Sequence, residues 1–197
     1  MRFLNKKMRY IFLPLASVVV WAAQSAFGSD LESCGNNENL FQDPSFTQID
    51  DQTGGWIYSQ HTGNRSFDIS AIDGELEIRR IDQEPWMIFY HTVIDPSLSG
   101  VTVHFSAELS GDAPAQPRIH GFPHKAGLYL KVGSQRNAIV ADHAPNSGKW
   151  DWQAISVKKA VPEGVTELRV GFVHQSGGVL RVRNPALTYT DCSTKVN

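Results

Sequence analysis

The sequence has little cysteine, no excess of basic charge and no sustained helical pattern, and each absence excludes a class of protein. Two cysteines in 197 residues are too few for a fold built on disulfide bonds or for a multi-cysteine zinc module. Eighteen basic against twenty acidic residues lack the basic excess of a dedicated nucleic-acid-binding protein. By contrast, 41% hydrophobic and 10% aromatic residues exclude a largely disordered chain, and the length predicts a single domain.

The sequence also lacks the short motifs of common catalytic sites. It has no Gly-x-Ser-x-Gly elbow, no His-Glu-x-x-His motif and no phosphate-binding loop, and neither cysteine is placed as a nucleophile. Glu75, Glu77 and Glu108 stay as candidates for glycoside hydrolysis, which requires only two carboxyl groups about 5–10 Å apart. Alternating surface carboxylates usually serve solubility, so we expect a protein that is not an enzyme.

The first 28 residues are basic and then apolar. They contain four of the 18 basic residues and no acidic residue, an apolar run over 10–23, and small residues at 26 and 28. This order is typical of a secretory signal peptide, so we expect cleavage after Gly28 and a periplasmic or extracellular destination. A membrane anchor is the alternative, although the run is shorter than the ~20 residues that a membrane-spanning helix needs. The remainder has 14 basic against 20 acidic residues, a charge of about −6, which disfavours nucleic acid and anionic membranes as partners.

Cys34 and Cys192 lie near the two ends of the chain, 158 residues apart. In an oxidising compartment this placement predicts one disulfide that joins the ends and sets the first and last strands side by side. Loop-closure entropy for so long a loop gives an upper value of about 5 kcal/mol. A lipidated Cys34 is the alternative, but Asp30 and Glu32 place charge where a lipobox has apolar and small residues.

Between the cysteines, apolar and polar residues alternate as half-buried strands require. Turn-forming pairs such as Asp73-Gly74 and Gly177-Gly178 separate the alternating segments, and no segment has a capped 3.6-residue period. The pattern predicts an all-β fold, an antiparallel β-sandwich or jelly roll with few or no helices. The alternating segments are 75–79, 101–109, 128–132, 167–172 and 179–189.

Two parts of the chain resemble the carbohydrate-binding jelly rolls of the CenC type. The first is 39–46 (Asn-Leu-Phe-Gln-Asp-Pro-Ser-Phe) followed by Gly55-Trp56. The second comprises the closing segments at 150–165, 168–172 and 177–182. In addition, residues 84–132 are similar to a related galactose-binding-like domain of secreted and regulatory bacterial proteins.

The resemblance implies one jelly-roll domain over 39–192 and a role in binding carbohydrate. An N-terminal segment, 29–38, precedes this domain and contains Cys34, and a short tail, 193–197, follows it. We therefore expect a secreted monomer that binds carbohydrate or a cell-envelope polysaccharide without catalysis. Two alternatives stay open: a structural or protein-partner-binding envelope protein without a sugar site, and a small polysaccharide lyase or hydrolase.

The resemblance also implies a structural calcium ion, for which this sequence lacks acidic ligands. Where the family places Glu after the opening Phe and an Asp pair near the final strand, this chain has Thr47 and Asn184-Pro185. Calcium takes several oxygen ligands, mostly from carboxylates, so we expect no cofactor. A weaker calcium site built from Asp43, Asp191 and backbone carbonyls is the alternative.

Sugar binding in such modules uses aromatic rings, which stack on the apolar face of a sugar, and neighbouring polar groups, which bind its hydroxyls. If Met87 and Phe89 face the core, Trp86 and Tyr90 point outward; in the opposite phase, Met87 and His91 point outward. We expect the outward residues of neighbouring strands to share one sheet surface with them. The predicted ligand-binding residues are Trp86, Tyr90, His104, Tyr129 and Lys131. Burial of Trp86, Tyr90 and Tyr129 together favours the structural alternative.

The remaining aromatic and histidine residues favour packing over chemistry. We expect Trp56, Trp150 and Trp152 in the core or at a sheet edge, because large aromatic side chains usually bury. Several histidines have the side-chain chemistry of zinc ligands, but they lie in a proline-containing loop without the helix that aligns such ligands. We therefore expect a solvated loop and no metal ion there. The residues concerned are His120, His124 and His143, beside Asp142.

Overall fold

The computed structural model describes residues 37–49, 55–113, 121–122, 125–134, 139–141 and 148–190. All of these residues belong to one compact unit, 33–197. The predicted signal peptide, both cysteines and the histidine-containing loop residues at 120, 124 and 143 lie outside the described residues. Among the described residues, no helix is long and apolar enough to cross a membrane.

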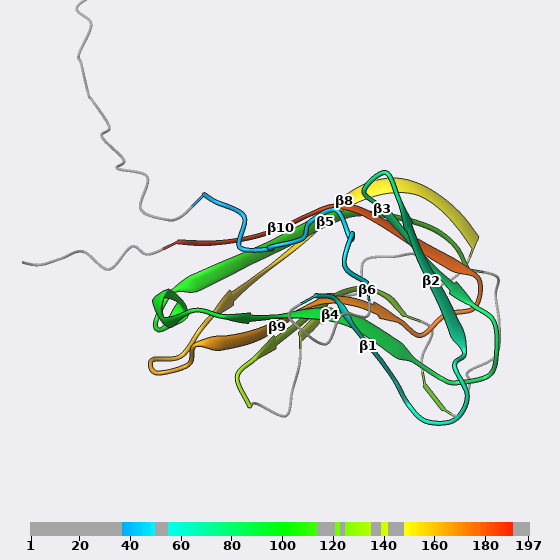
Figure 1. The fold of residues 1–197 in the computed structure, drawn as a ribbon, viewed down its shortest axis with the longest axis horizontal. Coiled ribbons are helices and arrows are strands. Elements are labelled where there is room, and N and C mark those ends of the chain that lie inside the picture. Colours follow the sequence, from blue (N-terminus) through cyan, green and yellow to red (C-terminus); the bar gives the residue numbers. More distant parts are fainter. Residues whose placement is uncertain are drawn as a thin grey trace, which may run out of the picture. The chain divides into compact units, whose positions relative to one another are not determined.

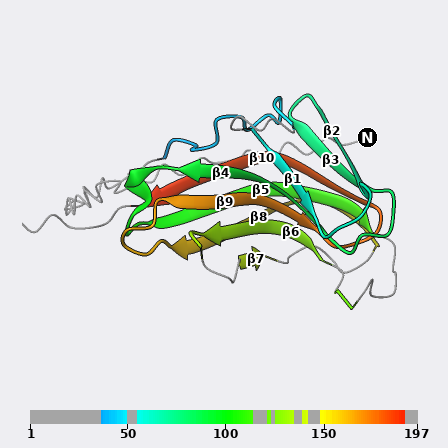
Figure 2. The same ribbon diagram turned by 60° about the horizontal axis from the view of Figure 1, so that its bottom comes forward.

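In the part of the chain that the structure describes, ten strands form two antiparallel five-stranded sheets packed face to face, which confirms the predicted β-sandwich. One sheet has the order β1-β4-β9-β6-β7 and the other the order β2-β3-β10-β5-β8. Figure 1 shows the two layers, with β3, β5, β8 and β10 above β1, β4 and β9, and Figure 2 shows the same strands from a second side. The strands are β1 (Ile57–Gln60), β2 (Phe67–Ile72), β3 (Glu75–Arg80), β4 (Met87–Ile94), β5 (Thr102–Ala113), β6 (Ala126–Val132), β7 (Ile139–Ala141), β8 (Gly148–Ala160), β9 (Glu167–His174) and β10 (Val179–Thr190).

Aromatic residues fill the space between the sheets, with Trp56 among them. Trp56 is fully buried, stacks on Phe89 and Phe172 at centroid distances of 5.3 and 5.8 Å, and donates its indole N–H to the carbonyl oxygen of Asp43 at 2.8 Å. The bond matters because a buried indole N–H without a partner destabilises the fold. Trp150 is also buried. The prediction of core packing is therefore confirmed for both tryptophans.

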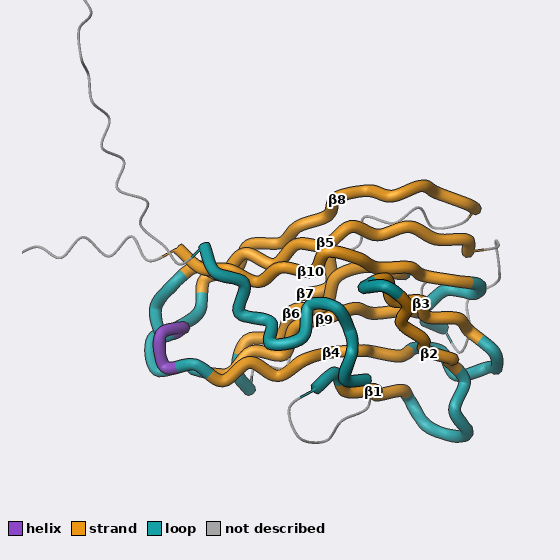
Figure 3. Tube along the Cα trace, turned by 45° about the horizontal axis from the view of Figure 1, so that its top comes forward, coloured by secondary structure: helices purple, strands orange, loops and turns teal. Residues whose placement is uncertain are grey.

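The N-terminal segment runs along β10 before it turns toward β1 (Figure 3). Leu40 donates its N–H to the carbonyl oxygen of Leu187 at 2.9 Å. Asn39 donates to the carbonyl oxygen of Pro185 at 2.9 Å and accepts from the N–H of Leu187 at 3.0 Å. These bonds extend the sheet next to a bulge between Arg183 and Ala186.

The residues of the resemblance at 39–46 therefore have structural roles in this chain. Asn39 pairs with β10, while Phe41 and Phe46 are buried in the core. Phe46 adopts a φ of 57°, a left-handed conformation that ends the turn begun at Asp43. The segment is a signature of the fold, and none of these four side chains lies on an outer sheet surface.

Candidate functional site

The outer surface of the β1-β4-β9-β6-β7 sheet displays the outward side chains of its central strands. On β4, Met87 and Phe89 are fully buried, so their neighbours Ile88 and Tyr90 point away from the core. The opposite phase, which places His91 outward, is wrong because His91 is buried as well. The burial of the core therefore settles which face of β4 is available to a ligand.

A pair of tyrosines occupies the middle of this surface. Tyr90 on β4 and Tyr129 on β6 both lie opposite Gly171 of β9, one from each side. Their ring centroids are 6.4 Å apart and the ring planes are inclined by 51°. A Cβ at residue 171 would lie 2.1 Å from the carbonyl oxygen of Phe89, so only glycine fits. Because Gly171 has no side chain, the two rings approach each other over β9.

The two tyrosines differ in their exposure. Tyr129 is 8% exposed, whereas Tyr90 is half-buried. Burial raises the pKa of the Tyr129 hydroxyl above its ordinary value, against the smaller lowering effect of the Arg169 charge. The Tyr129 hydroxyl is therefore protonated at neutral pH, and it can both donate and accept a hydrogen bond.

Two basic side chains border the tyrosines. Arg169 of β9 and Lys131 of β6 lie directly opposite each other, two residues along their strands from Gly171 and Tyr129. The guanidinium carbon of Arg169 lies 5.6 Å from the centroid of the Tyr90 ring, within the range of a cation–π contact. Below, the tyrosine face means Tyr90, Tyr129, Arg169 and Lys131. Arg169 was not among the predicted residues, because only the pairing of β9 with β4 and β6 brings it to the tyrosines.

Trp86 continues the aromatic surface beyond the start of β4. Its ring centroid is 6.1 Å from that of His61, which is in turn 6.1 Å from Phe122. The Nδ1 atom of His61 lies 3.1 Å from a carboxylate oxygen of Glu84, which fixes the imidazole between the two larger rings. Trp86 is half-buried and stands four residues from Tyr90, roughly 13 Å along the strand. The surface is therefore longer than one sugar ring.

His104 does not belong to this surface. It lies on β5, which pairs with β10 and β8 in the opposite sheet, so the expectation that β4 and β5 share one sheet is wrong. The connection between them contains the 3-10 helix η1 (Pro96–Leu98), whose Leu98 is fully buried and anchors the crossing from one sheet to the other. Alternation along each strand is the same whichever sheet it joins, so the pattern could not separate the two cases. Of the predicted residues, Tyr90, Tyr129 and Lys131 lie on one sheet, Trp86 directly precedes its strand β4, and His104 lies on the other sheet.

Glutamate and arginine side chains form ion pairs on the outer surface of the β2-β3-β10-β5-β8 sheet. The Nε atom of Arg181 lies 3.0 Å from Glu77, and Nη2 of Arg183 lies 2.6 Å from Glu108. Hydrogen bonds from Asn184 first and Arg183 second lower the pKa of Glu108. A glycosidase acid needs a raised pKa, so this environment opposes that role for Glu108.

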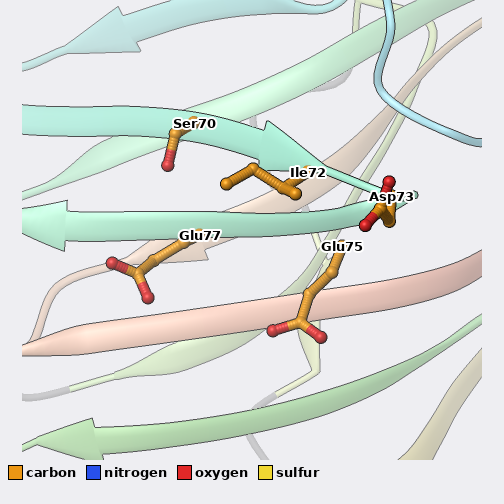
Figure 4. Close-up of a pocket in the computed structure, with 5 residues that line it drawn as sticks. All are labelled: Ser70, Ile72, Asp73, Glu75 and Glu77. Atoms are coloured by element: carbon orange, nitrogen blue, oxygen red, sulfur yellow. The ribbon is translucent and has the colours of Figure 1, made fainter.

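A pocket opens on the same sheet at the β2–β3 hairpin (Figure 4). Glu75 and Glu77 point to the same side of the hairpin, Asp73 lies at its turn, and the exposed Ile72 lies beside them. Arg181 lies 4.0 Å from Glu75, so part of the negative charge is balanced. The lining has no aromatic ring on which a sugar could stack. The residues that line it are Ser70, Ile72, Asp73, Glu75 and Glu77.

Asp43 is engaged in a turn. Its two carboxylate oxygens accept hydrogen bonds from the Thr47 hydroxyl at 2.9 Å and the Gln48 N–H at 2.8 Å. These bonds hold the pKa of Asp43 below its ordinary value although burial, the largest single effect, opposes them. Within the described part of the chain, no three acidic, histidine or cysteine side chains are grouped as metal ligands, and Asp191 lies outside it. Both carboxylate oxygens of Asp43 are therefore engaged by hydrogen bonds within the chain.

The β-sandwich fold of this chain is similar to the folds of solved carbohydrate-binding modules, in agreement with the fold that the resemblance implies. A CBM4 structure superposes with a TM-score of 0.52 over 75% of this chain and 98% of that chain, at 14% sequence identity. The CBM22-1–GH10 modules of Clostridium thermocellum endo-1,4-beta-D-xylanase 10B, complexed with xylohexaose, superpose with a TM-score of 0.51 at 13% identity. These likenesses establish the fold.

The same architecture also forms part of longer proteins. Bacteriophage CBA120 tailspike protein 4, in its enzymatically active domain, matches with a TM-score of 0.53 and 15% identity over 76% of this chain. This chain spans only 21% of that tailspike chain and 30% of the xylanase chain. No protein-family model matches the sequence, and no curated protein matches it.

Proposed function

We propose that this protein is a secreted, non-catalytic module that binds carbohydrate or cell-envelope polysaccharide. The observation that carries the proposal is the tyrosine pair over Gly171, set with Trp86 on the outward surface of one sheet. Aromatic rings on an open sheet surface stack on the C–H face of a sugar, and hydroxyl and amino groups beside them bind its hydroxyls. Here the Tyr129 hydroxyl and the Lys131 amine supply those groups.

The length of the surface supports an oligosaccharide over a single sugar. Trp86 and Tyr90 are roughly 13 Å apart along β4, so a ligand that touches both contains more than one ring. The fold adds support, since the structure of the xylanase that shares it was solved with xylohexaose. The sugar and linkage of the ligand differ between modules, so we assign the class of ligand only.

The ion pairs of two strand carboxylates support a role without catalysis. Glu77 and Glu108 each pair with an arginine at 3.0 Å or less, and both lie on the sheet opposite the aromatic surface. The exposure of the aromatic residues disfavours the structural alternative, because Trp86 and Tyr90 are both half-buried and only Tyr129 is buried. Secretion follows from the predicted signal peptide, and a monomer remains the expected state.

Binding on a glycan array, compared between variants, tests the proposal. We expect Trp86→Ala and Tyr90→Ala each to weaken binding about tenfold, since an aromatic contact contributes about 1–1.5 kcal/mol. Trp152→Ala is the matched control, because Trp152 lies on the other sheet, under Arg183 at 4.3 Å. Equal melting temperatures for the variants show that folding is retained.

Three results would count against the proposal. Loss of binding in Trp152→Ala alone would move the site to the other sheet. An array without any bound glycan would reject carbohydrate binding. Release of reducing sugars or unsaturated products from polysaccharides by the purified protein would replace a binding module with an enzyme.

A further inference from the structure

The tyrosine face places two positive charges side by side. Lys131 and Arg169 are directly opposite each other on neighbouring strands, and like charges in such positions repel. Both strands belong to a domain whose net charge is about −6 after the first 28 residues. The two cations are therefore a local feature and do not reflect a basic protein.

These cations have weaker ionic partners than those of the other sheet. Arg169 lies 3.4 Å from Glu167, with both side chains more than two-fifths exposed. Lys131 has no carboxylate within 4 Å among the residues that the structure describes. On the other sheet, Arg79, Arg181 and Arg183 each have a glutamate oxygen at 3.0 Å or less.

The two cations lie beside the tyrosines, within reach of a ligand bound there. The Arg169 guanidinium is held over the Tyr90 ring, and Lys131 follows Tyr129 by two residues on the same face of β6. A sugar stacked on the tyrosines therefore has both cations at its edge. A planar guanidinium and an ammonium group together match a carboxylate or sulfate, which accept charge-assisted hydrogen bonds.

We propose that the ligand of the tyrosine face is an acidic oligosaccharide, whose carboxylate or sulfate group lies between Lys131 and Arg169. This inference rests on the proposed function, because it names the chemical class of the sugar that the same surface binds. The half-buried Tyr90 supplies the stacking beside the buried Tyr129, and the two cations select for the anionic substituent. In the absence of that substituent, the exposed Glu167, 3.4 Å from Arg169, offsets only part of the mutual repulsion of Lys131 and Arg169.

The experiment compares acidic polysaccharides with their neutral counterparts by isothermal titration calorimetry. Polygalacturonate, alginate and hyaluronan are each titrated beside the same polymer with its carboxyl groups reduced, and dextran sulfate is titrated beside dextran. We expect at least one acidic polymer to bind about tenfold more tightly than its neutral form, and added NaCl to weaken that binding. The carboxylate and sulfate arms identify which anion is preferred.

Variants assign the preference to the two side chains. We expect Lys131→Gln and Arg169→Gln each to lose about tenfold in affinity for the acidic polymer. The loss for its neutral form should be smaller, because glutamine removes the charge but still hydrogen-bonds to hydroxyl groups. Lys131→Arg keeps the positive charge, so we expect it to bind the acidic polymer about as tightly as the wild-type protein does. Lys158→Gln is the matched control, because Lys158 is an exposed strand lysine on the opposite sheet and its loss leaves the affinity unchanged.

The outcomes separate this inference from the proposed function. Equal or tighter binding of the neutral polymers, or an unchanged acidic preference in the Lys131→Gln/Arg169→Gln double variant, would overturn the acidic ligand and leave carbohydrate binding in place. A domain that binds neither acidic nor neutral polymers, with an unchanged melting temperature, would overturn both. An equal loss of affinity in Lys158→Gln would show that the effect comes from the overall charge of the protein, and it would also overturn the inference.

Discussion

Two histidines lie in the core, where a positive charge is poorly solvated. His174 is fully buried, packs 5.5 Å from the Phe67 ring, and has a pKa lowered to about 4, chiefly by burial. His91 is also buried, and burial lowers its pKa as well. Both side chains are neutral in the folded protein at neutral pH, and both bind a proton more readily in the unfolded chain than in the folded one.

Acid should therefore destabilise the fold through His174. Its pKa falls from 6.5 in the unfolded chain to about 4 in the folded one, so the unfolded state binds more protons between these values. Stability is complete above pH 6.5 and falls by about 3 kcal/mol as the pH drops to about 4. Urea unfolding at a series of pH values measures the fall, and His174→Gln should flatten it by a similar amount. An equally steep profile in this variant would contradict the assignment.

Gly171 is the residue on which the tyrosine pair depends. A Cβ at this position meets backbone atoms of Phe89 and Tyr90, which cannot move without a shift of β4. We expect Gly171→Ala to destabilise the fold by about 2 kcal/mol or more, as measured by thermal unfolding. The exposed Ser156→Ala on β8 should stay within about 0.5 kcal/mol. Wild-type stability in Gly171→Ala would show that the strands β4 and β9 are not this close.

At the level of elements, hydrogen bonds hold the N-terminal segment against β10. Asn39 is its main polar contact, because one side chain satisfies the Leu187 N–H and the Pro185 carbonyl oxygen. The neighbouring Phe41 N–H also donates to the Asn39 side chain, at 3.2 Å. The amide therefore satisfies three backbone groups at once.

Asn39→Ala should cost about 2 kcal/mol, because it leaves these backbone groups without partners. Asn39→Asp, which keeps an acceptor for Leu187 and Phe41, should cost less. Gln42→Ala is the control, since Gln42 is exposed. Denaturant unfolding compares the three variants, and an effect of Gln42→Ala as large as that of Asn39→Ala would exclude the specific role of Asn39.

At the level of the whole molecule, the two ends of the described chain lie together. The N-terminal segment begins, and β10 ends, at the same end of the sandwich (Figures 1 and 2). The bonds from Asn39 and Leu40 to residues of β10 hold the segment and the strand side by side. Cys34 and Cys192 lie outside the described residues, and the disulfide between them stays a prediction.

Intact-mass analysis with and without reductant tests this bond. We expect reduction to add the mass of two hydrogens and alkylation to label the protein only after reduction. Reduction should also lower the stability, by no more than about 5 kcal/mol. Two thiols that react with the alkylating agent in the unreduced, secreted protein would contradict the prediction.

The sequence by itself determined the all-β class and several of the strands, but it left open which face of β4 points outward. Alternation of two residues is a local property, because successive side chains of a strand point to opposite faces. It therefore placed Tyr129 and Lys131 on the same face of β6 as each other. The motif at 39–46 and the Gly-rich turns were also readable, since they depend on backbone geometry within a few residues.

Only the tertiary structure decided which strands are neighbours. It moved His104 to the opposite sheet, and it brought Arg169 from β9 to the tyrosines of β4 and β6. It also paired the candidate carboxylates Glu77 and Glu108 with arginines of β10. Strand pairing depends on contacts between residues far apart in the chain, and these leave no mark on the alternation of any single strand. The pairing of the strands therefore decided which residues share the outer surface and which charges lie beside its aromatic rings.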